Sequence, residues 1–348
     1  MDLYDLGTAP WQDSQALYHA LAHLGREGLI LVEPATPYVC LGCHQDAAQE
    51  LDLEYITREA IPLFRREVGG GAVYLDRGQL FYQFVFRKDN PRLPAGKEAL
   101  YREYLQPVVE AFNDLGVPAV FKPVNDIVAN QRKISGNGAA EIGEAVVLVG
   151  NFIIDFNFTQ MSRVLKVPDE KFRDKVFKTL SENLTTIPRE AGRTPTHAEV
   201  AARLLARCEP RLGPFTPRAV DAELRAKADA LLTEYLRPEW IFANDQRARS
   251  GTAIKIAEGV YVIQKAVKAP GGLIRAAAVN RHGRLTDVHL SGDFFFYPAA
   301  RLAELERALE GVAVQAEAVA AAVARFYQAH GVETPGVRPE DFAQVLAA

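Results

Sequence analysis

The order of strand-like and helical segments constrains the fold of this chain most. Two blocks of short runs rich in aromatic and β-branched residues, within residues 29–156 and 252–290, flank residues 160–236, which are mostly helical in pattern with proline-rich breaks. Strands and helices that are segregated in this way, without regular alternation, favour an α+β class. We therefore expect mixed β-sheets flanked by helices, followed by a small α+β domain at the C-terminus.

Periodicity predicts the individual elements. Apolar residues at helical spacing predict helices over 11–25 and 98–115, the second with Pro107 inside it. The expected strands of the first block are 29–32, 38–41, 64–68, 79–86, 119–121, 126–129, 146–149 and 152–156. The second block predicts strands over 252–256, 261–267, 273–279 and 285–290, then helices over 301–309 and 314–327. We place a domain boundary between Trp240 and Gly251, which gives domains 1–247 and 248–348.

Composition excludes several classes of protein. The chain has 348 residues and a net charge of −4 without a long basic run, so nothing indicates a nucleic-acid groove. No apolar run reaches the roughly 18 residues of a membrane span, and the first residues lack the pattern of a signal peptide. Three cysteines are too few for a disulfide framework. We expect a cytoplasmic protein, and a monomer.

Three consecutive glycines, Gly69, Gly70 and Gly71, follow the arginine pair Arg65-Arg66. Glycine reaches backbone angles closed to other residues and leaves main-chain amides uncovered, so an anion or a flat ligand can approach the backbone. Arginine is well shaped to bind phosphate. The turn is therefore a candidate ligand site, although a tight hairpin with an exposed arginine pair is the commoner meaning of so short a motif taken alone.

The segment from Asn125 to Gly138 carries the second candidate. Its Asn125-Asp126 pair leads through a polar turn to Lys133, and small residues follow the lysine. A lysine beside a bound carboxylate and a phosphate offsets their mutual repulsion and stabilises the charge that develops as an acyl-adenylate forms. Asp126 is a candidate Mg²⁺ ligand, because that ion favours oxygen ligands and bridges a carboxylate to substrate phosphates. By itself, the segment also fits a surface hairpin with a solvated lysine.

Taken together, in this order and at this separation, the two segments resemble the lipoate–protein ligase family. The motifs are Arg-Arg-x-x-Gly-Gly-Gly-Ala-Val-Tyr-x-Asp from Arg65, Asn-Asp-Ile from Asn125, and Lys-Ile-Ser-Gly from Lys133. The similarity covers most of residues 1–190, and the segments 269–273 and 291–295 look like the accessory domain of the same ligases. The resemblance implies a catalytic domain with the fold shared by biotin and lipoate ligases (class II), followed by that accessory domain.

The same resemblance implies a reaction in two steps. Lipoate and ATP form lipoyl-adenylate and pyrophosphate, and a carrier lysine then attacks the adenylate. The implied carriers are lipoyl domains of 2-oxoacid dehydrogenases, the glycine-cleavage H protein or a specialised lipoate-binding protein. Lys133 is the expected catalytic residue, and Asp126 the expected Mg²⁺ ligand. The expected ATP-binding residues are Arg66, Gly71, Ala72, Val73, Tyr74, Asn125, Asp126 and Lys133, and the expected lipoate-binding residues are Gly69, Gly70, Gly71, Lys133, Ser135 and Gly136.

The chain departs from the family pattern at three places. Asn137-Gly138 follows Ser135-Gly136 where the family often has Ser-Ala-Gln, Val149 stands where many members carry a histidine, and Gly42-Cys43 replaces a common Gly-Arg. These departures concern the acyl substrate and the carrier more than the chemistry.

Two other functions fit part of the pattern. Related octanoyltransferases use a cysteine nucleophile and no ATP, but this chain has no cysteine between Cys43 and Cys208, where such a nucleophile is expected. A non-catalytic lipoate or lipoyl-carrier binding protein with a degenerate site is the other alternative. The Cys40-Leu41-Gly42-Cys43 spacing is typical of metal and redox sites, but a zinc site needs further ligands, so we expect buried strand cysteines.

Overall fold

The computed structural model describes residues 1–245, 255–257 and 259–347, which form two compact units. The first unit comprises Met1–Leu41, Glu50–Glu67 and Ala72–Ile241. The second comprises Gly42–Gln49, Val68–Gly71 and Phe242–Ala348. Two short segments from the first block of strands are therefore grouped with C-terminal residues. One boundary in the sequence cannot describe this division, because the second unit includes residues from both halves of the chain. The boundary at 247/248 stays a prediction.

The first unit is built on a mixed sheet whose described strands follow the order β11-β1-β2-β6-β10-β9-β8-β7. β1 pairs in parallel with β11 and β2, and the other neighbours are antiparallel. All of β6 except its last residue is buried, so both faces of this central strand need cover. The bounds are β1 (Asp2–Ala9), β2 (Gly28–Pro34), β6 (Gln79–Arg87), β7 (Ala119–Lys122), β8 (Asp126–Ala129), β9 (Arg132–Ile142), β10 (Ala145–Ile153) and β11 (Thr216–Pro217).

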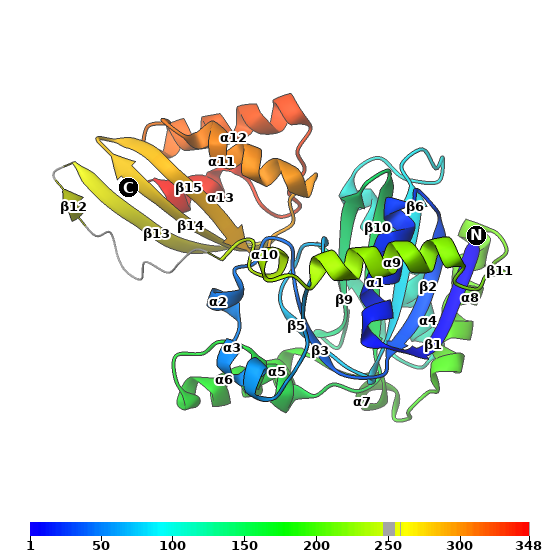
Figure 1. The fold of residues 1–348 in the computed structure, drawn as a ribbon. Helices are drawn as coiled ribbons and strands as arrows, with labels where there is room; N and C mark the ends of the chain where they lie inside the picture. The colour runs from blue at the N-terminus through cyan, green and yellow to red at the C-terminus, as the bar shows by residue number, and fades with distance from the viewer. Residues whose placement is uncertain (246–254, 258, 348) are drawn as a thin grey trace. The chain divides into compact units, whose positions relative to one another are not determined.

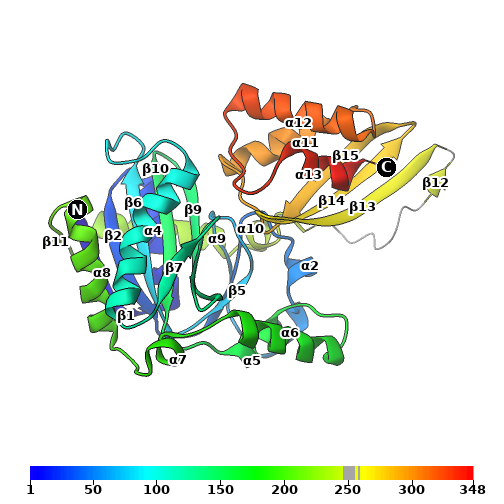
Figure 2. The ribbon, with the colours of Figure 1, turned by 180° about the vertical axis from the view of Figure 1, so that it is seen from behind.

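Helices supply that cover. The helices α1 (Trp11–His23) and α9 (Ala222–Tyr235) lie on one face of the sheet, and α4 (Lys97–Asp114) and α8 (His197–Leu212) lie on the other (Figure 1, Figure 2). The α4 helix continues through Pro107. The remaining helices of this part of the chain are α2 (Ala47–Glu50), α3 (Leu53–Arg58), α5 (Phe158–Val164), α6 (Glu170–Asn183), α7 (Ile187–Ala191) and α10 (Pro238–Ile241).

A small second sheet of the first unit carries two of the sequence motifs. Its order is β4-β3-β5, with β3 (Tyr38–Leu41) parallel to β4 (Leu63–Arg65) and antiparallel to β5 (Val73–Leu75). The four residues of β3 are all buried, as is usual for a central strand. Arg65, the first arginine of the pair, is therefore the last residue of β4 on one side of β3. Val73 and Tyr74 of the Ala-Val-Tyr motif lie in β5 on the other side.

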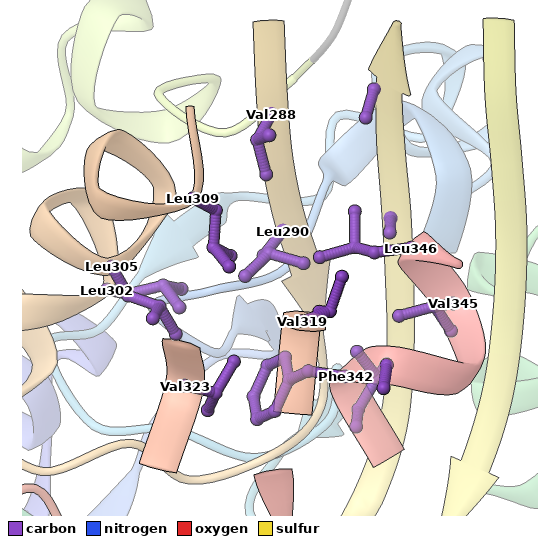
Figure 3. Packing of buried hydrophobic residues seen from close by; sticks show 14 of the residues in the cluster. Val288, Leu290, Leu302, Leu305, Leu309, Val319, Val323, Phe342, Val345 and Leu346 are labelled. Atoms are coloured by element: carbon purple, nitrogen blue, oxygen red, sulfur yellow. The ribbon is translucent and has the colours of Figure 1, made fainter. Parts of the chain in front are cut away.

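The second unit is a sheet in the order β12-β13-β14-β15 that packs helices on one face. Buried and less buried residues alternate along β14, the pattern of a strand with one face in the core. Figure 3 shows this core, to which β15 contributes Leu290, α11 Leu305, α12 Val323 and α13 Phe342. The bounds are β12 (Lys255–Ala257), β13 (Val260–Ala269), β14 (Gly272–Arg281), β15 (Arg284–Gly292), a 3₁₀ turn (Ala299–Arg301), α11 (Leu302–Leu309), α12 (Ala316–His330) and α13 (Pro339–Leu346).

The α+β architecture with mixed sheets is confirmed, and several element predictions need correction. The strand expected over 64–68 ends at Arg65, and those expected over 146–149 and 152–156 form one strand, β10. The elements β1, β5, β9 and α13 were not expected at all. β9 is rich in glycine, alanine and asparagine, which have low β propensity, and its pairing with β8 and β10 overrides that preference. Residues 252–254 of the strand expected over 252–256 lie outside the described residues.

None of the helices in the described part of the chain is long and apolar enough to cross a membrane.

Candidate active site around Lys133

A two-residue hairpin places Lys133 in the large sheet. Asn130 and Gln131 link β8 to β9, and both have positive φ angles, 47° and 66°. Two such residues in succession make the type I′ turn that matches the twist of paired strands. Lys133 is the second residue of β9 and lies opposite Val128. The polar turn that the sequence indicates is thus the tip of a hairpin.

A β-bulge fixes the backbone of Lys133. Lys133 pairs with Val128 while Ser135 pairs with Ile127, so Ile134 is an extra residue in β9. Bulges redirect side chains next to active sites. The carbonyl oxygen of Lys133 accepts a hydrogen bond from the Thr185 N–H at 2.9 Å. The lysine backbone is therefore held by β8 and also by the segment that follows α6.

The Lys133 side chain extends over Gly136 to Asp126. Its Nζ lies 2.6 Å from Asp126 Oδ1, and both side chains are about one-third exposed, at 36% and 32%. A Cβ atom at Gly136 would stand 3.2 Å from Lys133 Cε, closer than side chains normally approach. The glycine thus leaves the space that the lysine occupies. An ammonium held in this way is accessible and already paired with a carboxylate.

A cluster of hydrogen bonds joins β9, the strand that carries Lys133, to Tyr82 of β6 and to Asn125. Asn137 Nδ2 donates to the Asn125 carbonyl oxygen at 2.9 Å, and Asn125 Nδ2 donates in return to the Asn137 carbonyl oxygen. The Tyr82 hydroxyl donates to Asn137 Oδ1 and lies 3.1 Å from Ser135 Oγ. Burial raises the pKa of Tyr82, so the hydroxyl keeps the proton that it donates. A Cβ at Gly150 would collide with Asn137 Oδ1 and the Tyr82 hydroxyl, which makes glycine a requirement there.

A relay of side-chain amides connects the lysine strand to Tyr74. The Gly136 N–H donates to Asn151 Oδ1 at 2.9 Å, and Asn151 Nδ2 donates to Gln79 Oε1 at 2.7 Å. Gln79 Nε2 in turn donates to the Tyr74 carbonyl oxygen at 3.3 Å. These groups belong to β9, β10, β6 and β5. The structure therefore ties two motifs that lie 59 positions apart, at Tyr74 and Lys133, into one network.

Arg66 and Val73 both contact Cys40 of β3. Val73 pairs with Cys40, and Arg66 Nη1 lies 3.3 Å from the Cys40 carbonyl oxygen. Tyr74 is largely buried, and its N–H donates to Met161 Sδ at 3.3 Å. Burial and the nearby Asp76 raise the pKa of Tyr74 to about 12. Ala72, Val73 and Tyr74 thus belong to the same unit as Lys133, as does Arg66.

The three glycines belong to the second unit. A Cβ at Gly69 would stand 2.8 Å from Phe295 Cδ1, and one at Gly71 would be in ordinary contact with Asp293 at 3.9 Å. Gly70 has a φ angle of 93°, a conformation that favours glycine, and its carbonyl oxygen occupies the space that a Cβ of Gly42 would need. The Cys43 N–H also donates to the Val68 carbonyl oxygen at 3.1 Å. The turn is therefore packed closely against other residues of its own unit.

The site residues predicted from the sequence did not include Gln79, Tyr82, Asn137 or Asn151. A signal was present for part of this set, because Gln79 begins the otherwise largely apolar strand β6, Tyr82 lies within it, and Asn137 departs from the family pattern. Polar side chains in a buried strand need hydrogen-bond partners, so they mark a position where the interior is polar. What could not be read from the sequence is which partner each of them finds.

The cysteines do not form a metal centre in the structure. Cys40 and Cys208 are buried, Cys43 is partly exposed, and none of the three forms a disulfide bond. Burial raises the pKa of the Cys40 thiol, although Arg66 lowers it in part, and burial raises that of Cys208 to about 12. Within the described ranges, no group of three or more histidine, cysteine or acidic side chains could hold a metal ion.

The mixed sheet with helices on both faces is a fold shared with solved structures of lipoate–protein ligases. One is the bipartite lipoate protein ligase of Thermoplasma acidophilum, described with its E2 lipoyl domain. It has 26% identity and a TM-score of 0.63 over 72% of this chain and 98% of that one. A lipoate-protein ligase A bound with ATP gives 25% identity and a TM-score of 0.58 over 69% and 98%. The P. falciparum LipL1 structure, at 14% identity, shares the fold over 95% of both chains with a TM-score of 0.69.

This chain belongs to the lipoyl protein ligase A/B catalytic domain family, which matches residues 9–209. Residues 260–346 match the bacterial lipoate protein ligase C-terminus. Both matches agree with the resemblance drawn from the motifs.

Curated relatives include ligases and a transferase. Lipoate-protein ligase A subunit 1 of Thermoplasma acidophilum is 35% identical over 43% of this chain and 59% of its own length. Lipoate-protein ligase LplJ of Bacillus subtilis is 29% identical over 49% of this chain and 50% of its own. Octanoyltransferase LipM of Kyrpidia tusciae is 25% identical over 59% and 82%. The chain thus spans between half and three fifths of the length of these two ligases.

Proposed function

We propose that this chain is an ATP-dependent lipoate–protein ligase that activates lipoate as lipoyl-AMP and transfers it to a lysine of a carrier domain. The observation that carries the proposal is the Lys133 ammonium, which lies over Gly136 and is paired with Asp126, on a strand whose Gly136 N–H is linked to Tyr74 through one hydrogen-bond network. Family membership supports the same reading. We further propose residues 1–247 as the catalytic domain and 248–348 as an accessory domain.

In the first step, a carboxylate oxygen of lipoate attacks the α-phosphorus of ATP. The bond to the bridging oxygen breaks, and pyrophosphate leaves. Two anions must approach each other, and the fixed Lys133 ammonium offsets their repulsion without reorganisation. The Asp126 carboxylate holds the ammonium in place before the substrates bind. Arg66 and the Gly71–Tyr74 stretch are the proposed nucleotide contacts, together with Asn125, and Gly69, Gly70, Ser135 and Gly136 are the proposed acyl contacts.

In the second step, the neutral amine of the carrier lysine attacks the acyl carbonyl. The bond between the acyl carbon and the phosphate oxygen breaks, the new amide loses one proton, and AMP leaves. A homologue described together with its E2 lipoyl domain supports a lipoyl domain as the carrier. Lys133, in contact with both the carbonyl oxygen and the phosphate, stabilises the charge that develops on them.

Asp126 is the proposed Mg²⁺ ligand. Mg²⁺ is commonly bound by one or two carboxylates together with substrate phosphates, so a single partly exposed carboxylate at the nucleotide site fits this ion. When bound, the ion would neutralise phosphate charge. The homologue bound with ATP supports the nucleotide as the partner of such an ion.

The substitution Lys133→Ala tests the proposal. We expect a loss of adenylate formation of about 10²–10³-fold, as for removal of one preorganised donor to a transition state. Pyrophosphate release is the measurement, with circular dichroism to verify the fold. Lys88→Ala is the matched control, because it removes a lysine that forms an ion pair of 3.6 Å with Glu141 in the same unit. Equal pyrophosphate release by Lys133→Ala and wild type would reject the mechanism.

An ATP-independent octanoyltransferase is the second candidate, because the relative LipM is matched over 82% of its length. Transfer through a thioester needs a thiolate, and burial raises the pKa values of both Cys40 and Cys208. Cys43 remains for this role. Mass spectrometry of lipoyl domains decides between the two activities. Modification with ATP, Mg²⁺ and a mixture of lipoate and octanoate supports the ligase, whereas modification by octanoyl carrier protein without ATP, lost in Cys43→Ser, supports the transferase.

A further inference from the structure

The two neighbours of Arg66 are anchored in a buried polar cluster that the proposed reaction does not use. Arg65 is 1% exposed, and the Glu67 side chain is 23% exposed. Arg65 is the last residue of β4, and Glu67 follows Arg66 directly, so the attachments of Arg65 and Glu67 lie on either side of Arg66 along the backbone. Whatever fixes Arg65 and Glu67 therefore restrains the backbone of Arg66, from which its side chain extends.

The α10 helix holds Arg65. Arg65 Nε donates to the Ile241 carbonyl oxygen at 2.8 Å, and Trp240 Nε1 donates to the Arg65 carbonyl oxygen at 2.9 Å. Side chain and main chain of the same residue are thus bound by neighbouring residues of one helix. Hydrogen bonds that involve a charged group contribute more than neutral ones, which makes this a firm attachment.

The helices α1 and α9 hold Glu67. Its carboxylate accepts hydrogen bonds from His23 Nε2 at 2.8 Å and from the Tyr235 hydroxyl. The Glu67 N–H donates to His19 Nε2 at 3.2 Å. Burial by itself raises the pKa of the Glu67 carboxyl, but the hydrogen bonds from His23 and Tyr235 outweigh it and lower that pKa, so the carboxylate stays charged.

Tyr235 and Trp240 join the two attachments. Their rings stack with centroids 4.7 Å apart, and Tyr235 also meets His19 edge-on at 5.3 Å. One aromatic pair therefore reaches Glu67 through a hydroxyl and Arg65 through an indole N–H. Both residues lie outside the segments that match the two families, 9–209 and 260–346.

We propose that Tyr235 and Trp240 are positioning residues for Arg66: by holding Glu67 and Arg65 they fix the backbone of Arg66 at the position from which its guanidinium binds the nucleotide phosphates. The inference rests on the proposed role of Arg66 in ATP binding. Arg66 Nη1 also donates to the Cys40 carbonyl oxygen at 3.3 Å, so the guanidinium contacts β3 while the clamp of Arg65, Glu67, Tyr235 and Trp240 holds the backbone on either side of Arg66. Arginine binds phosphate through a planar fork, and a misdirected fork loses this geometry.

Tyr235→Phe tests the clamp, because it removes the hydroxyl and retains the ring that stacks on Trp240. We expect the KM for ATP to rise about tenfold, corresponding to one hydrogen bond to a charged group, with kcat within about twofold of wild type. Backbone amides of residues 65–68 should exchange faster with deuterium in the ligand-free protein. Trp240→Phe, which removes the indole donor to Arg65 and keeps an aromatic ring beside Tyr235, should act in the same direction and provides a second variant if Tyr235→Phe folds poorly.

Tyr104→Phe is the matched control, since it deletes a tyrosine hydroxyl that donates to the Arg92 carbonyl oxygen at 2.8 Å elsewhere in the same unit. It should leave both the KM for ATP and the exchange of residues 65–68 unchanged. An unchanged KM and unchanged exchange in Tyr235→Phe and Trp240→Phe would overturn the clamp. If wild type shows no ATP-dependent transfer, the proposed function fails, and the exchange measurement alone then decides whether the clamp holds Arg66.

Discussion

At the scale of single residues, two glycines leave the space that the polar side chains of the site occupy. Gly136 leaves space for the aliphatic part of Lys133, and Gly150 leaves space for the contact between Asn137 and Tyr82. Both glycines lie in strands, where glycine weakens β structure and often marks a close approach of another group. The strand interior is thus shaped to hold polar groups near the lysine.

The substitution Gly150→Ala should destabilise the protein by about 1–3 kcal/mol, because the new methyl group would overlap Asn137 Oδ1 and the Tyr82 hydroxyl in a buried cluster. Urea denaturation measures the change. Gly71→Ala is the control, since its methyl group would meet Asp293 only at an ordinary 3.9 Å. Equal denaturation midpoints for the two variants would contradict this account of Gly150.

At the scale of elements, the glycine turn is held by a segment that follows β15. Phe294 and Phe295 pack against Gly69, and the Gly292 N–H donates to the His44 carbonyl oxygen at 3.0 Å. The His44 and Phe294 rings stack 5.6 Å apart. The conformation of the turn is therefore set by residues more than 200 positions away in the sequence as well as by its own glycines.

A double-mutant cycle measures this packing. Gly69→Ala should cost about 1–3 kcal/mol, because its methyl group would stand 2.8 Å from Phe295 Cδ1. Phe295→Leu in the same chain should restore part of the loss, with a coupling energy of about 0.5–3 kcal/mol in thermal or urea denaturation. Gly42→Ala should not be rescued by Phe295→Leu, since it collides with the backbone of Gly70. Strict additivity of Gly69→Ala and Phe295→Leu would show that the two residues are independent.

At the scale of the whole molecule, stability is coupled to buried ionisable groups. His19 is fully buried on α1, its Nδ1–H donates to the Gln15 carbonyl oxygen at 2.7 Å, and its Nε2 accepts from the Glu67 N–H. Burial lowers the pKa of His19 from 6.5 to about 4. The unfolded chain therefore binds a proton at this residue at a higher pH than the folded protein does.

The sign of the pH dependence follows from that difference. Above pH 6.5 His19 is neutral in both states, and between pH 6.5 and about 4 only the unfolded state is protonated, so the free energy of unfolding falls as the pH falls. The full contribution is about 3 kcal/mol. Urea denaturation of wild type and His19→Gln over this range should give a shallower slope for the variant. His330→Gln is the control, because His330 is exposed, and it should keep the slope of the wild type. Equal slopes for wild type and His19→Gln would contradict the prediction.

Much of the fold was predictable because local signals agreed with the tertiary environment. Helical periodicity predicted α1 and α4 nearly to their ends, and aromatic and β-branched runs predicted β2, β3 and β6. β9 was missed because its small and polar residues carry no strand signal, and only the ladders with β8 and β10 make it extended. Of the proposed site, Lys133, Asp126 and the glycine turn were marked by residue type, whereas Gln79, Tyr82 and Asn151 were not.

The sequence by itself determined the class of fold, the motifs and the chemistry that a lysine and a glycine turn make available, because these depend on residue type and spacing along the chain. Only the tertiary structure decided which groups meet. It set the ion pair of Lys133 with Asp126, the relay from Gly136 to Tyr74 and the attachment of Glu67 to Tyr235, 168 positions away. Such contacts arise from strand register and helix packing, which bring together residues that no local pattern relates.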